Sequence, residues 1–91
     1  MNHDSRIRHI ADRTAHYWIC VYGHVAPDWC EQLGGMKATA VDSGSGLPMT
    51  VLTGQLPDQA ALAGVLTCLH DYGLALISLE RREAELLQRS G

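Results

Sequence analysis

The chain has 91 residues, of which 46% are hydrophobic and 19% charged, and its formal net charge at pH 7 is −3. A chain of this length folds as one small domain, which excludes multidomain enzymes and repeat solenoids. Area scaling indicates that folding buries only roughly 60–65% of the surface of the unfolded chain. The core is therefore expected to be thin, and self-association is expected to add to its stability.

Charge and hydropathy narrow the classes of partner and location. The sequence contains no run of about 18 apolar residues, and its first residues are polar where a signal peptide is apolar, so neither a membrane span nor secretion is predicted. The expected location is cytoplasmic. A sequence pI near 5.9 argues against nucleic acid as a partner, because phosphate recognition normally needs a basic surface.

No catalytic residue, cofactor or metal site is predicted. Cys20, Cys30 and Cys68 do not form a C-x-x-C pair or a disulfide framework, and we expect all three to be reduced. The five histidines lack the paired spacing of a closed zinc site. The sequence therefore predicts a fold more strongly than it predicts a reaction.

The N-terminal part of the chain predicts an arm and a strand. In residues 1–16, Ile7 and Ile10 have helical spacing with charged residues between them, which favours a weakly amphipathic helix or a partly ordered arm. Residues 17–25 concentrate β-branched and aromatic side chains before Pro27, which predicts a strand.

The middle of the chain predicts a short helix, a hairpin and a longer helix. Residues 27–33 can form a short helix that ends at two glycines. A Ser-Gly-Ser-Gly turn joins strands over residues 36–42 and 49–56. Asp58 is then placed to cap a helix whose leucines and valine recur with the spacing of one buried face.

The C-terminal part predicts one more strand and a helical tail. Residues 74–79 are almost continuously apolar, as in a buried strand. Residues 80–91 are predicted as a helical tail with Leu86 and Leu87 as its apolar anchors. The single α+β domain is thus expected over residues 17–79, between an arm and a tail.

This order of elements predicts a ferredoxin-like split βαβ fold, an α+β arrangement with a four-stranded antiparallel sheet and helices on one face. Its first helix is short, and a loop in its place is an alternative. Helical extensions are expected at both ends of the chain.

Alternation along the first strand separates an aliphatic face from an aromatic one. The aliphatic face suits the core under the helices. The other face is predicted to be the interface or ligand face, and it comprises Trp18, Cys20, Tyr22 and His24. Such a row is too apolar for an ordinary wet surface. The cover could be a second copy of the chain, the terminal segments, or a ligand such as a small aromatic molecule or stacked nucleobases.

One stretch resembles a group of short bacterial proteins of uncharacterised function. Residues 54–62 match their Gly-x-Leu-x-Asp-Gln-Ala-Ala-Leu helix start, and residues 72–78 follow their Leu-Gly-Leu-x-Leu-x-Ser strand with Tyr72 and Ala75 in place of leucine and proline. The resemblance draws attention to Gln59, either as a first-turn residue or as a loop anchor facing a pocket. Trp29, near the end of the first strand region, is the other candidate pocket residue.

The favoured function is a small non-enzymatic binding or assembly module, a homodimer whose terminal arms dock a protein partner. The alternative is a small-ligand sensor or a cyclase- or isomerase-like enzyme, with a pocket on the open sheet face lined by Trp18, Tyr22, His24 and Trp29. Nucleic-acid binding through arginines near the two ends of the chain is a third, weaker hypothesis, because the central strands offer only Lys37.

Overall fold

The computed structural model describes residues 5–83 and has an α+β fold. Its seven elements are α1 (Ser5–Ala11), β1 (Ala15–Tyr22), the 3₁₀ helix η1 (Pro27–Trp29), β2 (Lys37–Asp42), β3 (Pro48–Leu56), α2 (Gln59–Asp71) and β4 (Ala75–Glu83). The strands form one antiparallel open sheet in the order β2-β3-β1-β4.

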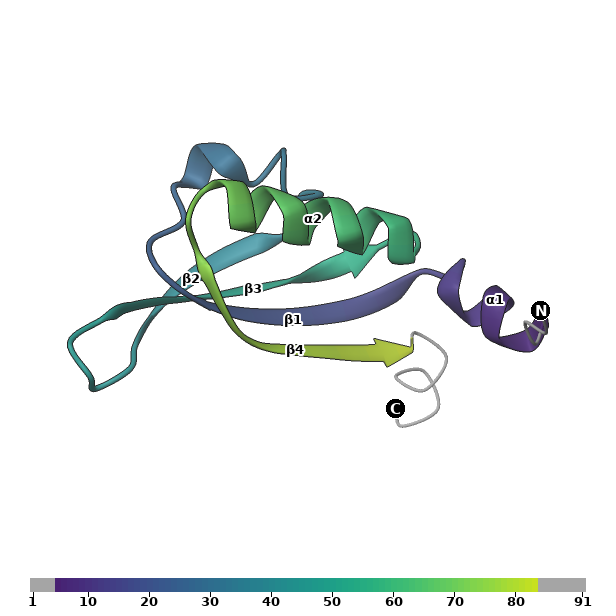
Figure 1. Cartoon of the computed structure of the whole chain (residues 1–91), viewed down its shortest axis with the longest axis horizontal. Coiled ribbons are helices and arrows are strands. Elements are labelled where there is room, and N and C mark those ends of the chain that lie inside the picture. The colour runs from purple at the N-terminus through teal and green to yellow at the C-terminus, as the bar shows by residue number, and fades with distance from the viewer. Residues whose placement is uncertain (1–4, 84–91) are drawn as a thin grey trace.

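Strand β1 lies at the centre of the sheet, between β3 and β4 (Figure 1). Its pairing with β3 runs from Ala15 opposite Leu56 to Tyr22 opposite Met49. Its pairing with β4 contains a bulge between Cys20 and Val21, where Ile77 is the extra residue. The outer strands β2 and β4 are the two edges of the sheet.

One layer covers one face of the sheet. Helix α2 and the segment around η1 lie on the same side (Figure 1). Because side chains alternate across a strand, every second residue of β1 points to this layer, and Tyr17, Ile19 and Val21 are fully buried there. The core also contains Val25, Leu33, Met36, Leu52, Leu56, Leu62, Val65 and Leu69.

Helix α2 has well-defined ends. The Asp58 carboxylate accepts a hydrogen bond of 2.8 Å from the Ala61 amide and so satisfies an N–H group that the helix leaves unpaired. Gly73 follows the helix with a φ of +79°, and its amide donates to the His70 carbonyl. The chain then turns into β4.

Three predicted elements differ from those observed. Strand β1 ends at Tyr22 because Gly23 adopts a φ of +122° and turns the chain, so His24 lies beyond the strand. The short first helix is reduced to the single 3₁₀ turn η1. The tail helix is wrong for residues 80–83, because β4 continues to Glu83 in partnership with β1. Residues 84–91 lie outside the described part of the chain.

The segment before β1 forms the helix α1, one of the two alternatives expected for the arm. Within residues 5–83, no helix has the length and apolar character needed to cross a membrane.

Candidate functional site

The sheet face opposite α2 has no covering layer among the described residues, and we call it the open face (Figure 1). Residues directly opposite each other in an antiparallel pair point to the same face. The register therefore assigns these residues to the open face: His16, Trp18, Cys20 and Tyr22 on β1, Met49, Val51, Thr53 and Gln55 on β3, Lys37, Thr39 and Val41 on β2, and Ser78, Glu80 and Arg82 on β4.

The centre of the open face is apolar. Trp18, Cys20 and Val51 are half-buried on the two central strands, and Tyr22 is 41% exposed. Val41 extends this apolar region onto β2 and is exposed. Polar and charged side chains surround it at the sheet edges, which is the usual anatomy of a protein interface: an apolar centre within a polar rim.

A charged cluster holds Trp18 in place at one end of the open face. The His16 ring lies 4.7 Å from the Trp18 ring between centroids, and the Arg82 guanidinium lies 5.2 Å from the Trp18 centroid. Arg82 also forms an ion pair of 2.9 Å with Glu80. Exposed contacts of this kind contribute about 0.5–1 kcal/mol or less each. Their main effect is therefore to fix the orientation of the indole.

A hollow of about 340 Å³ lies beside this cluster, lined by Trp18, Ile19, Cys20, Val51, Ser78, Glu80 and Arg82. Its wall combines an aromatic ring, a thiol and an ion pair. A flat apolar molecule could lie in it, but none of the lining groups is arranged as a nucleophile with an adjacent base.

The structure brings together only part of the predicted site. Trp18, Cys20 and Tyr22 share the open face, whereas His24 is exposed in the turn after β1. Trp29 lies on the helix side, where its ring stacks on Tyr72 with centroids 4.1 Å apart. The predicted pocket that combined Trp29 with Trp18, Tyr22 and His24 is therefore wrong, because η1 packs against α2 instead of the open face.

The contacts around Trp29 join η1 to the end of α2. The Tyr72 hydroxyl donates a hydrogen bond to the side-chain oxygen of Gln32. The Cys68 thiol lies 3.8 Å from the Gln32 carbonyl oxygen, a weak hydrogen bond. These contacts give Trp29 a structural role in fixing the segment that replaces the first helix.

Asp58 caps α2, as its position in the sequence predicts, and Gln59 is the exposed first residue of that helix. Neither lies on the open face. The structure thus assigns Asp58 to helix stability and leaves Gln59 at the surface of the covered side.

The sequence does not predict the residues that the strands next to β1 contribute to the open face. The sequence predicts a helix at Glu80 and Arg82 and an arm at His16, whereas the strand register places all three on the open face. Residues 80–83 are four charged side chains in succession and show no alternation of apolar and polar residues, so only the pairing with β1 reveals this part of the strand.

The described residues contain no group of three or more His, Cys, Asp or Glu that could hold a metal ion. The three cysteines, all within this part of the chain, are free and half-buried.

Together these features define a small α+β domain with an open sheet face as its candidate functional surface. The profile of a protein family described as a domain of unknown function (DUF8691) matches residues 16–80, more than two thirds of the chain. The chain belongs to this family. No curated protein and no solved structure matches the chain at a significant level.

Proposed function

We propose that this protein is a non-enzymatic binding and assembly module that forms a homodimer by packing the open faces of two copies together. The observation that carries the proposal is the apolar centre of the open face, with Trp18, Cys20 and Val51 half-buried and Tyr22 exposed. An apolar surface inside a polar rim favours burial against another surface. A second copy offers the same surface in a self-complementary arrangement.

The size of the face supports this interface. Four strands at about 4.8 Å spacing, each about eight residues long at about 3.3 Å per residue, present roughly 500 Å² per copy. Two copies then bury about 1,000 Å², the lower bound for a specific protein interface.

The docking of a protein partner is assigned to the terminal segments. Ile7 and Ile10 of α1 are exposed on a helix that leads away from the sheet (Figure 1). The location proposed for the assembly is the cytoplasm, where free thiols such as those of Cys20, Cys30 and Cys68 stay reduced.

The fold we propose for each copy is the ferredoxin-like split βαβ arrangement with η1 in place of the first helix. The strand order β2-β3-β1-β4, the antiparallel pairing and the placement of α2 between β3 and β4 in the chain support this assignment. The resemblance of residues 54–78 to short bacterial proteins stays a prediction.

The hollow beside Trp18 favours a second candidate, a sensor or enzyme for a small apolar ligand. Its lining is apolar on the side of Trp18 and Val51 and charged on the side of Glu80 and Arg82. A screen of flat aromatic compounds tests it: ligand-induced thermal stabilisation that is lost in Trp18→Ala favours the sensor, and no stabilising compound counts against it.

Oligomeric state tests the dimer directly. Light scattering over a concentration series is expected to show at least two copies for the wild type. Tyr22→Arg is expected to weaken the sheet-face association at least about tenfold, because it buries a charge against an apolar surface. Leu47→Arg is the matched control, since Leu47 is 57% exposed in the loop between β2 and β3.

Chemical cross-linking adds a position-specific measurement. Stacked sheets lie about 10 Å apart, which exceeds the Cα separation of about 7 Å that a disulfide tolerates. In a Cys30→Ser/Cys68→Ser variant, a short bis-maleimide is therefore expected to join two Cys20 thiols where oxidation does not. A wild type that stays a monomer at all concentrations would overturn the proposed function.

A further inference from the structure

The open face carries opposite charges on its two edges, at the same level of the sheet. Residues that pair across neighbouring strands form rows, and one row runs from Lys37 on β2 through Thr53 and Trp18 to Glu80 on β4. Lys37 and Glu80 are both exposed. This row therefore has an amine at one end and a carboxylate at the other.

The two central strands also change in character along their length. Their paired residues on the open face are polar at the start of β1 and apolar at its end. In this order they are His16 beside Gln55, Trp18 beside Thr53, Cys20 beside Val51, and Tyr22 beside Met49. The open face thus has a polar end and an apolar end.

Two open faces can pack with aligned strands about a two-fold axis that runs along the strands or across them. An axis along the strands keeps each row opposite the same row of the second copy and exchanges its two ends. An axis across the strands reverses the order of the rows, so that the polar end of one face meets the apolar end of the other.

We propose that the two copies pack about an axis along the strands, between β1 and β3, and that Lys37 of each copy forms an ion pair with the partner's Glu80. This inference rests on the proposed function, because it specifies how the two open faces meet. The central position of the axis brings all four strands into contact. By symmetry the ion pair occurs twice in the dimer.

This arrangement matches side chains of similar polarity. Strand β1 of one copy lies over β3 of the other, so His16 faces the partner's Gln55, and Cys20 faces the partner's Val51. Polar groups thus meet polar groups, and apolar groups meet apolar groups. Such complementarity is what makes an interface specific.

The position of Lys37 argues against the other axis. An axis across the strands places β2 over β2 of the second copy, where the open-face residues are Lys37, Thr39 and Val41. The amine would then be covered without a carboxylate opposite it, and burying an unpaired charge is costly. With the axis along the strands, the amine meets a carboxylate that already pairs with Arg82 at 2.9 Å.

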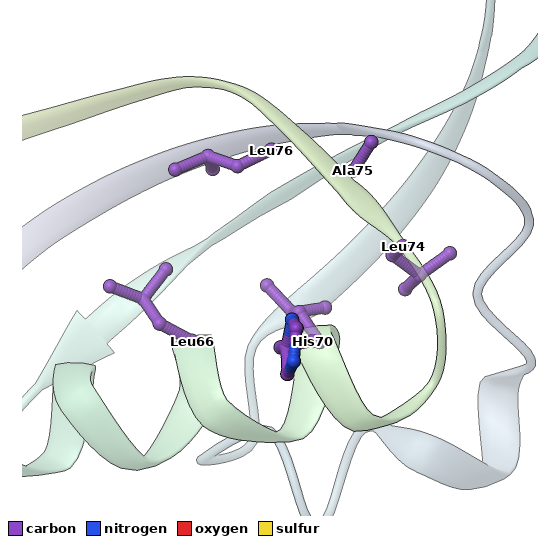
Figure 2. A pocket seen from close by; sticks show the side chains of 6 residues that line it. Leu66, His70, Leu74, Ala75 and Leu76 are labelled. Atoms are coloured by element: carbon purple, nitrogen blue, oxygen red, sulfur yellow. The ribbon is translucent and has the colours of Figure 1, made fainter.

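The helix layers lie on the outside of this dimer. A groove of about 320 Å³ between α2 and the start of β4 lies on that side, so it stays outside the interface (Figure 2). Both copies of β1 point the same way, so both α1 helices leave the dimer at the same end. A partner with two equivalent sites then binds both helices at once, which raises its apparent affinity.

Charge reversal in two populations of the protein tests the ion pair. Lys37→Glu and Glu80→Lys each place like charges opposite each other twice in their own homodimer, and each is expected to weaken it at least about tenfold. Both side chains are exposed, so the fold tolerates the changes. When the two variants are mixed, their heterodimer joins opposite charges at both contacts.

Native mass spectrometry, with one variant labelled with heavy nitrogen, separates the heterodimer from the homodimers. The heterodimer is expected to exceed the roughly half of all dimers that random pairing gives. Glu31→Lys is the matched control for Glu80→Lys, because Glu31 is exposed next to η1 on the helix side. Its mixture with Lys37→Glu is expected to give no excess of heterodimer.

A carbodiimide, which joins an amine to a carboxylate as an amide, tests the contact in the wild type. Lys37 is the only lysine in the sequence. Within one copy, Lys37 and Glu80 lie on opposite edges of the sheet, three strand spacings or about 14 Å apart, too far for direct coupling. A coupled Lys37–Glu80 peptide therefore reports two copies. Lys37→Arg is the control, because it keeps the charge and removes the amine.

The outcomes distinguish this inference from the proposed function. An excess of heterodimer together with the coupled peptide supports the proposed axis. A wild type that dimerises, while the mixed variants give no excess of heterodimer, overturns the axis and leaves the sheet-face dimer in place. A wild type that stays a monomer at all concentrations overturns both.

Discussion

Tyr17 places a hydroxyl group in the core of this protein. The residue is fully buried on β1, and its hydroxyl has no hydrogen-bond partner among residues 5–83. The Arg81 guanidinium lies 5.9 Å from the centre of its ring, and an Arg81 amino group donates a hydrogen bond to the Ile10 carbonyl. Tyr17 thus contributes through the packing of its ring, while its hydroxyl carries a desolvation cost.

Replacing Tyr17 with phenylalanine is therefore expected to raise the free energy of unfolding by about 1 kcal/mol, because an unpaired buried hydroxyl costs about 1–3 kcal/mol. Urea denaturation measures the change. Tyr72→Phe is the control: its hydroxyl donates to Gln32, so its loss is expected to lower stability by about 1 kcal/mol. Equal losses in the two variants would contradict the role assigned to Tyr17.

At the same scale, the sequence predicted the site on one strand only. Alternation placed Trp18, Cys20 and Tyr22 on one face because the rule is local. His24 does not follow this alternation, because Gly23 turns the chain before it. A glycine can also continue a strand, so the sequence does not show that the strand ends there. Arg82 reached Trp18 only through pairing between β1 and β4, a contact over more than 60 residues that no local pattern reports.

At the scale of elements, α2 was predicted almost completely. Its cap at Asp58 and its buried face of Leu62, Val65 and Leu69 are local features of the sequence. The sequence predicts a shorter last strand, over residues 74–79, because Leu86 and Leu87 favour a helix over residues 80–91. Residues 80–83 form a strand instead, because they pair with the first half of β1.

Gly64 offers a test of how α2 meets its surroundings. It is exposed, and a Cβ atom built on it meets nothing within 4 Å, so it does not serve close packing against the sheet. Gly64→Ala is expected to raise the free energy of unfolding by about 1 kcal/mol through helix propensity. Urea denaturation measures this change.

Gly34→Ala is the control for that experiment. Gly34 has a φ of +70°, and an added Cβ would lie 2.7 Å from a Leu56 methyl carbon, so the substitution is expected to destabilise the fold by about 1 kcal/mol or more. A loss of stability in Gly64→Ala would show that α2 needs glycine at this position for a reason other than packing on the sheet.

At the scale of the whole molecule, the described residues 5–83 place a single layer on one side of a four-stranded sheet and leave apolar side chains exposed elsewhere. The length of the chain predicted this thin core, and the structure locates the surplus on the open face and along β4. Fold class and sheet composition were accessible from the sequence, because they depend on the order and type of elements. The surfaces that meet in an assembly depend on the three-dimensional shape of the folded chain. The periodicity of apolar residues in the sequence does not report that shape.

The melting temperature of the wild type is expected to rise with protein concentration, because association stabilises the folded state by mass action. Differential scanning fluorimetry over a hundredfold range of concentration measures the shift. Tyr22→Arg is the control and is expected to melt at one temperature throughout. A wild-type melting temperature independent of concentration would contradict the proposed dimer.

The two tryptophans lie on opposite sides of the sheet, and this gives the protein two optical reporters. Trp29 stacks on Tyr72 between η1 and α2, so its emission follows the unfolding of each copy. Trp18 lies on the open face beside Arg82, so its emission follows whatever covers that face. Each of the variants Trp18→Phe and Trp29→Phe retains one tryptophan, so their fluorescence reports folding and association separately, without any attached dye.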